Sequence, residues 1–276
     1  MFNTDTVYEV VIFSTGDTKA GTKMGKLQLK DPADGSLLNC IMWEETLSRM
    51  DSKIFRCGNL VRIVSATFNE KFNNCLISAL ELVKEAKTGL SVDEREALFK
   101  EVTSYFAKIR CEKLRSFLNT YFEKHAELIK VTPAAKLMHH NYIGGLLVHI
   151  SECLKYAEAN MAISDFEFNA DDILGACILH DIGKIFEYKI DTESGLVDYN
   201  EWFYKDWITH SQYGFSICMN EGLKGIARMI AAHHGRADWG AIIDLNQKDI
   251  EPELYFLHLV DNLSAKFGKT NVGKLD

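Results

Sequence analysis

The stretch that decides the fold of this chain is Cys177-Ile178-Leu179-His180-Asp181-Ile182-Gly183-Lys184. It places an imidazole and a carboxylate side by side in an apolar run, and an ammonium group follows three residues later. Burying an unpaired charge is costly, so an apolar run has little reason to hold these groups unless they meet a metal or an anion. On a helix, His180, Asp181 and Lys184 share one side, because residues three and four apart are neighbours there.

Other polar residues interrupt apolar, helical-looking sequence in the same way. They are His149, His210, the pair His233-His234, and Asp261. A single histidine of this kind is normally a packed core residue, but the set as a whole calls for another explanation. Mixed nitrogen and oxygen ligands suit Mn²⁺, Fe²⁺ or Mg²⁺, and the two oxygens of Asp181 could bridge two cations. We therefore predict that these groups fold onto His180 and Asp181 as a metal-dependent phosphodiesterase centre.

Length and composition predict a soluble protein of about two domains. The chain has 276 residues, of which 47% are hydrophobic and 25% are charged, as is usual for globular proteins. Its seven cysteines are scattered and form no CxxC pair, which indicates reduced thiols without a zinc site of their own. No apolar run approaches the roughly 18–20 residues that span a bilayer, and the first residues do not resemble a signal peptide. We expect a cytoplasmic protein with no membrane partner.

The formal net charge of -8 does not indicate nucleic-acid binding, but the charge is unevenly distributed. Residues 1–90 carry eleven basic and eleven acidic side chains, so the whole excess belongs to residues 91–276. Binding of a nucleic-acid polymer must therefore rely on local patches or bound cations, because the global field is unfavourable.

The N-terminal part of the chain, residues 1–88, is predicted to form a small β-barrel. Short β-rich or alternating segments are separated by turn formers such as Pro32-Ala33-Asp34-Gly35, the pattern of half-buried strands. The predicted strands are 7–13, 25–31, 37–43, 58–64 and 75–80. The order of these segments, with "GxLxLxD" and a strand that ends in Trp43, resembles an OB-fold of the type that binds nucleic acids.

An OB-like module implies a surface that binds single strands. OB-folds commonly stack bases on exposed aromatic side chains beside a basic groove. The candidates are Trp43, Phe68 and Phe72, with Lys71, Lys19, Lys23 and Lys26 nearby in sequence. The alternative is that Trp43 and Phe68 are core residues and Phe72 anchors a loop. An OB module can also serve only for docking or for assembly of a homo-oligomer.

Residues 89–276 are predicted to be all-helical, which makes the fold class multidomain α and β. Apolar residues recur there at three- and four-residue steps. We expect one helix from about 142 to 159 and another from 171 to 186, a helix that begins near His210, one that ends at His233-His234, and one that carries Asp261. His139 or His140 could line the site, with capping or packing as the alternative.

The order H…HD…H…HH…D resembles that of the HD-domain metallophosphohydrolases over residues from about 140 to 267. This resemblance implies ligands for two metal ions, with Asp181 as the bridge. His149, His180, Asp181 and Asp261 match the ligands of the first ion, and His210 and His233 match those of the second. His234 matches either a ligand or a group that binds the phosphate.

A more specific resemblance is to the YhaM-like 3′–5′ exoribonucleases, which join an OB-type module to an HD domain. The runs "HHNYIGGLLVH", "LHDIGK", "HHGRADWG" and "DNLSAKF" carry it. The HD-GYP phosphodiesterases of cyclic dinucleotides match less well. They have Glu where this chain has Gly145, they carry a GYP motif that is absent here, and they read HHE where this chain reads His233-His234-Gly235.

The resemblance implies a manganese-dependent 3′–5′ exoribonuclease that acts on single-stranded RNA, and on DNA as a further substrate. Two cations can share and activate a water molecule, while Lys184 helps to neutralise the phosphoryl oxygens. We expect Asp181 and Lys184 to be catalytic, with helix-dipole pairing as the alternative for Lys184. Arg236 could grip a phosphate and Trp239 could stack a base, with a structural role as the alternative for each.

Two other classes of function remain open from the residues alone. One is an HD-type nucleotide phosphohydrolase or cyclic (di)nucleotide phosphodiesterase, in which the OB-like module is regulatory. The other is a nucleic-acid-binding factor with a vestigial HD centre. The complete set of candidate ligands argues against the vestigial centre, since drift would be expected to remove at least one of them.

Overall fold

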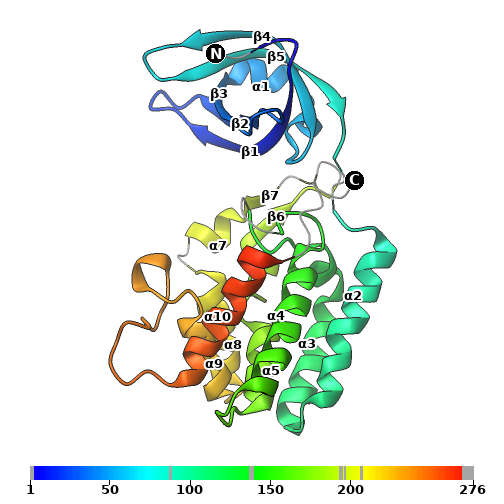
Figure 1. The fold of residues 1–276 in the computed structure, drawn as a ribbon, viewed down its shortest axis with the longest axis vertical. Helices are drawn as coiled ribbons and strands as arrows, with labels where there is room; N and C mark the ends of the chain where they lie inside the picture. Colours follow the sequence, from blue (N-terminus) through cyan, green and yellow to red (C-terminus); the bar gives the residue numbers. More distant parts are fainter. Residues whose placement is uncertain are drawn as a thin grey trace. The chain divides into compact units, whose positions relative to one another are not determined.

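The computed structural model describes residues 3–86, 89–136, 140–192, 195, 197–205 and 208–268. Contacts between Cα atoms divide the chain into two compact units, shown as ribbons in Figure 1. One comprises residues 3–86 with 191, 192 and 195, and the other comprises the remaining described residues from 89 to 268.

The N-terminal unit is a closed five-stranded barrel. Its strands are β1 (Val7–Asp17), β2 (Lys23–Lys30), β3 (Leu37–Trp43), β4 (Leu60–Asn69) and β5 (Asn74–Lys84). The order around the barrel is β1-β2-β3-β5-β4, and β1 closes it by pairing with β4. The pairing of β3 with β5 is parallel and all other pairings are antiparallel. The predicted OB-like barrel is confirmed.

The barrel core follows the alternation of the strands. Leu27 and Leu29 of β2 and Cys40 and Met42 of β3 point inward and are buried, as expected where successive side chains face opposite sides. The residues between them form an outward face on which Lys26 lies opposite Ile41. This face belongs to the surface that OB-folds use for ligands.

Several parts of the barrel differ from the sequence prediction, and β4 and β5 both run further than the predicted 58–64 and 75–80. The segment 14–17, expected to be loop, continues β1 and pairs with residues 23–26 of β2. The turn is then closed by hydrogen bonds between Thr18 and Thr22. Between β3 and β4 the chain forms a short helix α1 (Glu44–Arg49) and a 3₁₀ turn η1 (Ser52–Phe55), neither of which was predicted.

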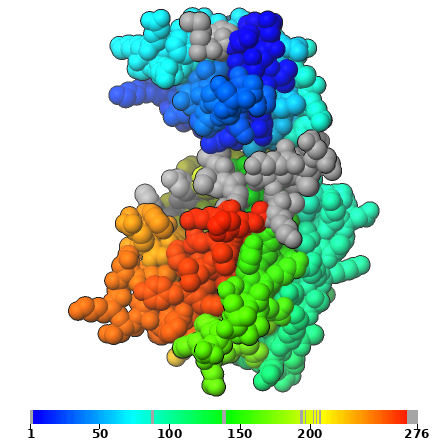
Figure 2. Space-filling view, viewed as in Figure 1, coloured from blue at the N-terminus to red at the C-terminus, as the bar shows by residue number. Residues whose placement is uncertain are grey.

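The second unit is mainly helical, as predicted. Its helices are α2 (Val92–Ser104), η2 (Tyr105–Lys108), α3 (Glu112–Val131), α4 (Gly145–Ile163), α5 (Ala170–Leu179), α6 (Lys184–Glu187), α7 (Glu201–Lys205), α8 (His210–Asn220), α9 (Lys224–Ala232), η3 (Ala237–Trp239) and α10 (Pro252–Phe267). The last helix, α10, packs against α4, which lies far earlier in the chain. Figures 1 and 2 show these two helices side by side. Among the described residues, none of the helices is long and apolar enough to cross a membrane.

The helical unit departs from the prediction at its centre. The helix expected over 171–186 stops at Leu179, and α6 begins only at Lys184. Between them the backbone makes tight turns, in which the amide of Ile182 donates to the carbonyl of Leu179 and that of Lys184 to Asp181. A small two-stranded sheet follows, β6 (Tyr188–Ile190) with β7 (Val197–Tyr199), so the unit is not purely α-helical.

Candidate metal centre

His180 and Asp181 lie at the end of α5, where the helix gives way to the tight turns. The Nδ1 of His180 lies 3.0 Å from the carbonyl oxygen of Cys177. A carbonyl can only accept a hydrogen bond, so the proton of the neutral ring is on Nδ1. The Nε2 of His180 is thereby left without a proton and available to a metal.

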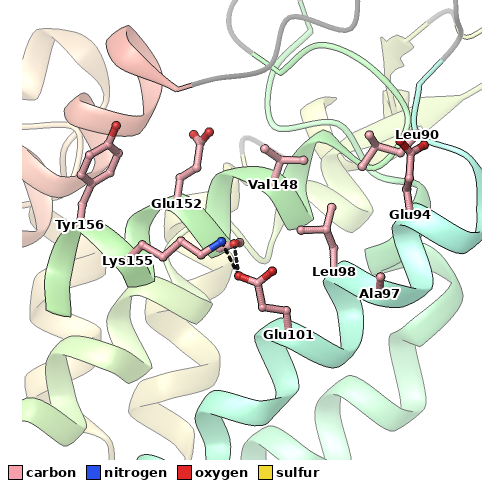
Figure 3. Close-up of a pocket in the computed structure, with 10 residues that line it drawn as sticks. Leu90, Glu94, Ala97, Leu98, Glu101, Val148, Glu152, Lys155 and Tyr156 are labelled. Atoms are coloured by element: carbon pink, nitrogen blue, oxygen red, sulfur yellow. Dashed lines mark hydrogen bonds and ion pairs between the residues drawn. The ribbon is translucent and has the colours of Figure 1, made fainter. Parts of the chain in front are cut away.

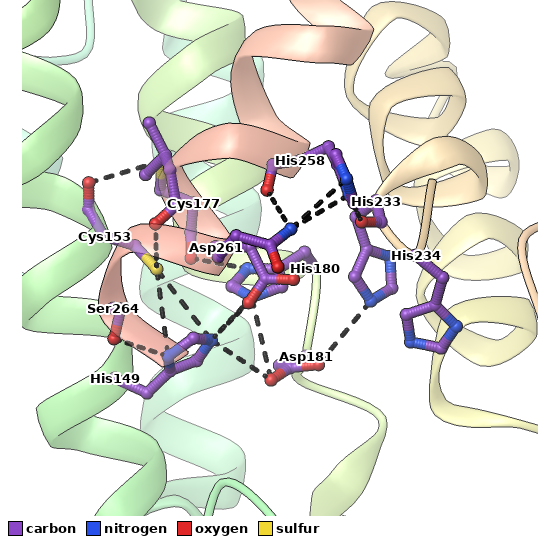
Figure 4. A network of polar contacts seen from close by, with 12 residues as sticks. His149, Cys153, Cys177, His180, Asp181, His233, His234, His258, Asp261 and Ser264 are labelled. Carbon is purple, nitrogen blue, oxygen red and sulfur yellow. Dashed lines mark hydrogen bonds and ion pairs between the residues drawn. The ribbon is translucent and has the colours of Figure 1, made fainter. Parts of the chain in front are cut away.

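The first cluster forms where His149 of α4 and Asp261 of α10 approach this pair (Figure 4). The Nε2 of His149 lies 3.0 Å from the Nε2 of His180 and 3.2 Å from the Oδ1 of Asp261. It also lies 3.4 Å from the Oδ2 of Asp181. Two ring nitrogens and two carboxylate oxygens, drawn from three helices and a turn, therefore converge on one point.

The second cluster gathers around the other oxygen of Asp181. The Oδ1 of Asp181 lies 3.4 Å from the Nε2 of His210 and 3.8 Å from the Nε2 of His233. The Nε2 of His234 lies 3.0 Å from that of His210. His210 is the first residue of α8, and the two adjacent histidines follow the end of α9. The carboxylate of Asp181 thus presents one oxygen to each cluster.

The protonation pattern of the rings fits a bound divalent metal. The Nδ1 of His210 is 2.5 Å from the carboxylate of Glu187, and the Nδ1 of His233 is 2.7 Å from the carbonyl of Ile230. Both rings therefore carry their proton on Nδ1. In the described part of the chain, the buried Nε2 of His233 and Nδ1 of His234 have no hydrogen-bond partner. Buried nitrogen atoms with unshared lone pairs are costly unless a cation satisfies them.

Comparison with known proteins agrees with this arrangement. Residues 146–266, which include all of the candidate ligands, match the model of the HD domain family. A second family model, TraI_2 ("Putative helicase"), matches residues 82–205. No solved structure matches the chain.

The chain is also similar to proteins named 3′-5′ exoribonuclease YhaM. That of Halalkalibacterium halodurans is 25% identical over 182 residues, which cover 61% of this chain and 52% of the relative. That of Geobacillus sp. strain WCH70 is 27% identical over 186 residues, which cover 63% of this chain and 53% of the relative. The matched region thus spans about half the length of these relatives. The resemblance to the YhaM-like family is confirmed.

The electrostatics of the site keep His180 and His234 neutral and Asp181 charged. Burial lowers the pKa of His180, and lowers that of His234 to about 4, so that both rings are neutral at pH 7. Burial alone would raise the pKa of Asp181, but Lys184 and the nearby histidines hold it well below its usual range. Neutral imidazole and ionised carboxylate are the forms that bind metals.

Lys184 begins α6 and turns back onto Asp181. Its Nζ lies 2.5 Å from the Oδ2 of Asp181, and only 8% of the residue is exposed. Burial opposes the charge of this ammonium, but the carboxylate of Asp181 outweighs burial and raises the pKa of Lys184. Lys184 therefore lies on the same side as Asp181, as the sequence predicted, and faces the candidate metal centre.

The other candidates in the helical unit are surface residues. Arg236 and Trp239 follow the histidine pair, and Trp239 is 60% exposed. The guanidinium of Arg236 makes two hydrogen bonds of 2.9 Å to Asp238 and lies 5.0 Å from the ring centre of Trp239. A phosphate would have to compete with Asp238 for this guanidinium. The sequence analysis also named His139 or His140 as a residue that could line the site, and His139 lies outside the described residues.

The three aromatic candidates of the barrel separate into two groups. Trp43 is 50% exposed and Phe72 is 65% exposed, and the Nζ of Lys71 lies 5.4 Å from the ring centre of Phe72. Phe68 instead packs against the barrel core. The alternative considered from the sequence, that Trp43 and Phe68 are core residues, therefore holds for Phe68 but not for Trp43.

Several residues of the centre were missed from the sequence. Glu187, Glu152 and Ser264 lie in polar or mixed stretches, where nothing contrasts them with their neighbours. Cys153 is one of the scattered thiols for which the sequence predicts no metal site, yet its Sγ lies 3.8 Å from the Nε2 of His149. Burial raises the pKa of the Cys153 thiol well above its ordinary value, so it packs beside the ring as a neutral group.

The two glycines that argued against the HD-GYP type have steric reasons to be glycine. A Cβ on Gly145 would collide with the backbone carbonyl oxygen of His140. Gly235 has φ +81°, and a Cβ there would lie 2.5 Å from the Cε1 of His258. A glutamate at either position would require the backbone or the ring to move, so this packing is incompatible with a glutamate in those places.

Proposed function

We propose that the protein is a metal-dependent 3′–5′ exoribonuclease that hydrolyses phosphodiester bonds of single-stranded RNA. The observation that carries this proposal is the position of Asp181, with one oxygen toward His149 and the other toward His210. Two clusters that share one carboxylate match the two-metal centres of enzymes that cleave phosphate esters. The similarity to proteins named as 3′-5′ exoribonucleases supports the choice of polymer.

The centre is proposed to hold two ions, with Mn²⁺ favoured and Fe²⁺ or Mg²⁺ as alternatives. His149, His180, Asp181 and Asp261 would hold the first ion, and His210, His233 and Asp181 the second, with His234 as a further ligand or phosphate contact. Such a mixture of imidazole and carboxylate suits these metals better than soft metals, which prefer thiolates. When bound, the cations supply Lewis-acid chemistry, which polarises water and phosphoryl oxygens.

The protein's own residues would set the geometry of the reaction. The carboxylate of Asp181 fixes the spacing of the two clusters, and the buried Lys184 places a positive charge beside it. An ammonium held at this position can neutralise charge that develops on a phosphoryl oxygen. His234, whose Nδ1 is buried without a partner among the described residues, can offer a lone pair to a cation or donate a ring proton to an oxygen of the bound phosphate group. Arg236 and Trp239 provide an exposed guanidinium and ring next to the histidine pair for the neighbouring nucleotide.

The barrel is proposed to bind the single strand. Trp43 stands at the end of β3, Phe72 lies in the turn between β4 and β5, and Lys26 lies on the outward face of β2. Aromatic rings with nearby cations can stack bases of any sequence, which suits an enzyme that moves along a polymer. DNA is a further proposed substrate. The alternative use of the barrel is assembly into a homo-oligomer. The proposed location of the protein is the cytoplasm.

The test is digestion of 5′-end-labelled single-stranded RNA by the purified full chain with Mn²⁺, beside a DNA of the same sequence. We expect stepwise shortening from the 3′ end, and loss of this activity in Asp181→Ala. A matched control is Asp165→Ala, which removes an exposed carboxylate from the same helical unit. Absence of shortening, or full activity of Asp181→Ala, would overturn the proposal. Turnover of free nucleotides or cyclic dinucleotides without polymer cleavage would favour the small-molecule alternative.

A further inference from the structure

A chain of hydrogen bonds runs behind the first cluster and joins four buried or nearly buried side chains. The Nδ1 of His149 lies 2.8 Å from the Oγ of Ser264, and this Oγ lies 2.8 Å from the Oε2 of Glu152. The Nε2 of His140 lies 3.0 Å from the same Oε2. His149 and Glu152 belong to α4, Ser264 to α10, and His140 to the segment that precedes α4.

The direction of the hydrogen bonds in this network follows from the carboxylate of Glu152. A carboxylate only accepts, so Ser264 donates its single hydroxyl proton to Glu152. The oxygen of Ser264 can then act toward His149 only as an acceptor, which places the ring proton of His149 on Nδ1. The Nε2 of His149 is left with a lone pair, directed at His180, Asp181 and Asp261.

This assignment explains the shortest contact of the first cluster. The Nε2 atoms of His149 and His180 are 3.0 Å apart, and the hydrogen bonds on the far side of each ring leave both without a proton. Two lone pairs at this distance repel each other unless a cation lies near both. Glu152 and Ser264 therefore hold His149 in the tautomer and orientation that a metal ligand requires.

We propose that Glu152 and Ser264 are positioning residues that fix His149 as a ligand of the first metal ion, with His140 steadying Glu152. The inference rests on the proposed function only in that a metal occupies the first cluster. Glu152 acts through the hydroxyl of Ser264 and does not itself reach the centre. His210 of the second cluster differs, because its Nδ1 contacts the carboxylate of Glu187 directly. Removing the hydroxyl of Ser264 should therefore affect one of the two ions.

A second glutamate, which lines the same groove as Glu152, provides a control. Figure 3 shows Glu152 in the wall of a groove between α2 and α4, with a volume of about 610 Å³. Glu101 lies in the same groove and bonds Ser151 at 2.7 Å and Lys155 at 2.5 Å. The two glutamates thus share a groove, but only Glu152 is connected to a candidate ligand. A general effect of charge in the groove would be seen at both.

The experiment is titration of the metal-free full chain with Mn²⁺, followed by equilibrium dialysis and metal analysis. The variants are Ser264→Ala, Glu152→Ala, Glu152→Gln, the double variant Glu152→Ala/Ser264→Ala, and Glu101→Gln as control. We expect Ser264→Ala and Glu152→Ala each to weaken one of the two ions by about 10–100-fold. The double variant should be no weaker than Ser264→Ala, because both changes break the same path. Glu152→Gln keeps an acceptor and should stay within a few-fold of wild type, as should Glu101→Gln.

Several outcomes would overturn the proposal. These are additive losses in the double variant, equal weakening of both ions, or a loss in Glu101→Gln as large as that in Glu152→Ala. Ser264→Ala removes a single hydroxyl, so it carries the test if Glu152→Ala does not fold. In an RNA digestion, Ser264→Ala should need more Mn²⁺ for half-maximal rate but should approach the wild-type rate at saturation. If no RNA is cleaved but the pattern of metal affinities holds, the proposed function fails and the positioning role stands.

Discussion

Lys184 and Asp181 form a buried ion pair, in which the Nζ of the lysine lies 2.5 Å from the Oδ2 of the aspartate. Asp181 is 2% exposed and Lys184 is 8% exposed, so water screens this pair weakly. The histidines around Asp181 are buried, and burial lowers the pKa of His180 and His233. The lysine is therefore the permanent positive charge that balances the carboxylate when no metal is present.

The first prediction concerns this pair. Lys184→Met keeps most of the volume of the side chain but leaves the carboxylate unpaired, and loss of one partner of a buried pair costs about 3–5 kcal/mol. We expect the free energy of unfolding to fall by about this amount in EDTA, and by less in saturating Mn²⁺, because a bound cation restores the balance of charge. Urea denaturation in the two conditions measures both values.

The control for this prediction is Lys205→Met, which breaks an exposed pair with Glu201. Exposed pairs contribute at most about 1 kcal/mol, so this variant should unfold almost as the wild type does in either condition. An equal loss of stability for Lys184→Met with and without Mn²⁺ would contradict the idea that lysine and metal balance the same carboxylate.

The second prediction assigns each cluster to its own ion. His149→Ala removes a ligand of the first cluster, His210→Ala removes a ligand of the second, and Asp181→Asn weakens both. Metal analysis after dialysis against limiting Mn²⁺ should give about one ion per chain for each histidine variant and fewer for Asp181→Asn. His125→Ala, a histidine of α3 outside both clusters, should keep the wild-type content. Loss of both ions in either single histidine variant would indicate one cooperative site.

The candidate ligands could be found from the sequence because each is a polar residue among apolar neighbours. His149, His180, Asp181 and Asp261 each stand in apolar sequence, where a polar side chain needs a reason. The same signal is absent for Glu187, which follows Lys184-Ile185-Phe186 in a mixed stretch and yet holds the ring of His210. A glutamate in such a stretch resembles any solvated residue until its partner, 23 positions later, is known.

Long-range contacts and very short elements were also beyond the sequence. The bond from His149 to Ser264 joins residues 115 positions apart, and no local pattern encodes it. The strands β6 and β7 have three residues each, too few to show the two-residue alternation of a strand. The end of α5 at Leu179 was missed because the apolar pattern continues through it, while the backbone changes to tight turns. The five strands of the barrel were predicted because their alternation and turn residues are local.

The third prediction tests the barrel surface. Trp43→Ala and Phe72→Ala should each weaken binding of a single-stranded RNA by about 1–3 kcal/mol, the typical contribution of one base stacked on an aromatic ring. Fluorescence anisotropy with a labelled oligonucleotide and Asp181→Ala protein, which should not cleave it, measures this change. The melting temperature should be nearly unchanged, because both side chains are at least half exposed.

Two controls separate stacking from stability in the barrel. Val64→Ala removes an exposed apolar side chain from β4 that is not an aromatic ring, and should leave RNA affinity unchanged. Phe68→Ala should instead lower stability, because this ring packs against the barrel core. Unchanged affinity in both Trp43→Ala and Phe72→Ala would leave the barrel as a docking or assembly module.

The fourth prediction concerns Gly235, next to the histidine pair. Its φ of +81° disfavours any side chain, and a Cβ would lie 2.5 Å from the ring of His258. That ring donates from Nδ1 to the carbonyl of His233 at 2.6 Å, so displacing it disturbs the backbone that positions the second cluster. Gly235→Ala should therefore lose more stability than the roughly 1–2 kcal/mol of a left-handed backbone alone, and should bind Mn²⁺ more weakly.

Gly222→Ala is the matched control for the backbone cost. Gly222 has φ +66°, but its Cβ would approach only the Nζ of Lys113 at the end of a flexible side chain. It should show the left-handed penalty without a change in Mn²⁺ affinity. Adding His258→Ala to Gly235→Ala removes the clash, so the double variant should be more stable than Gly235→Ala alone. If the double variant is less stable instead, with losses that add, the collision with His258 is not the reason for glycine at this position.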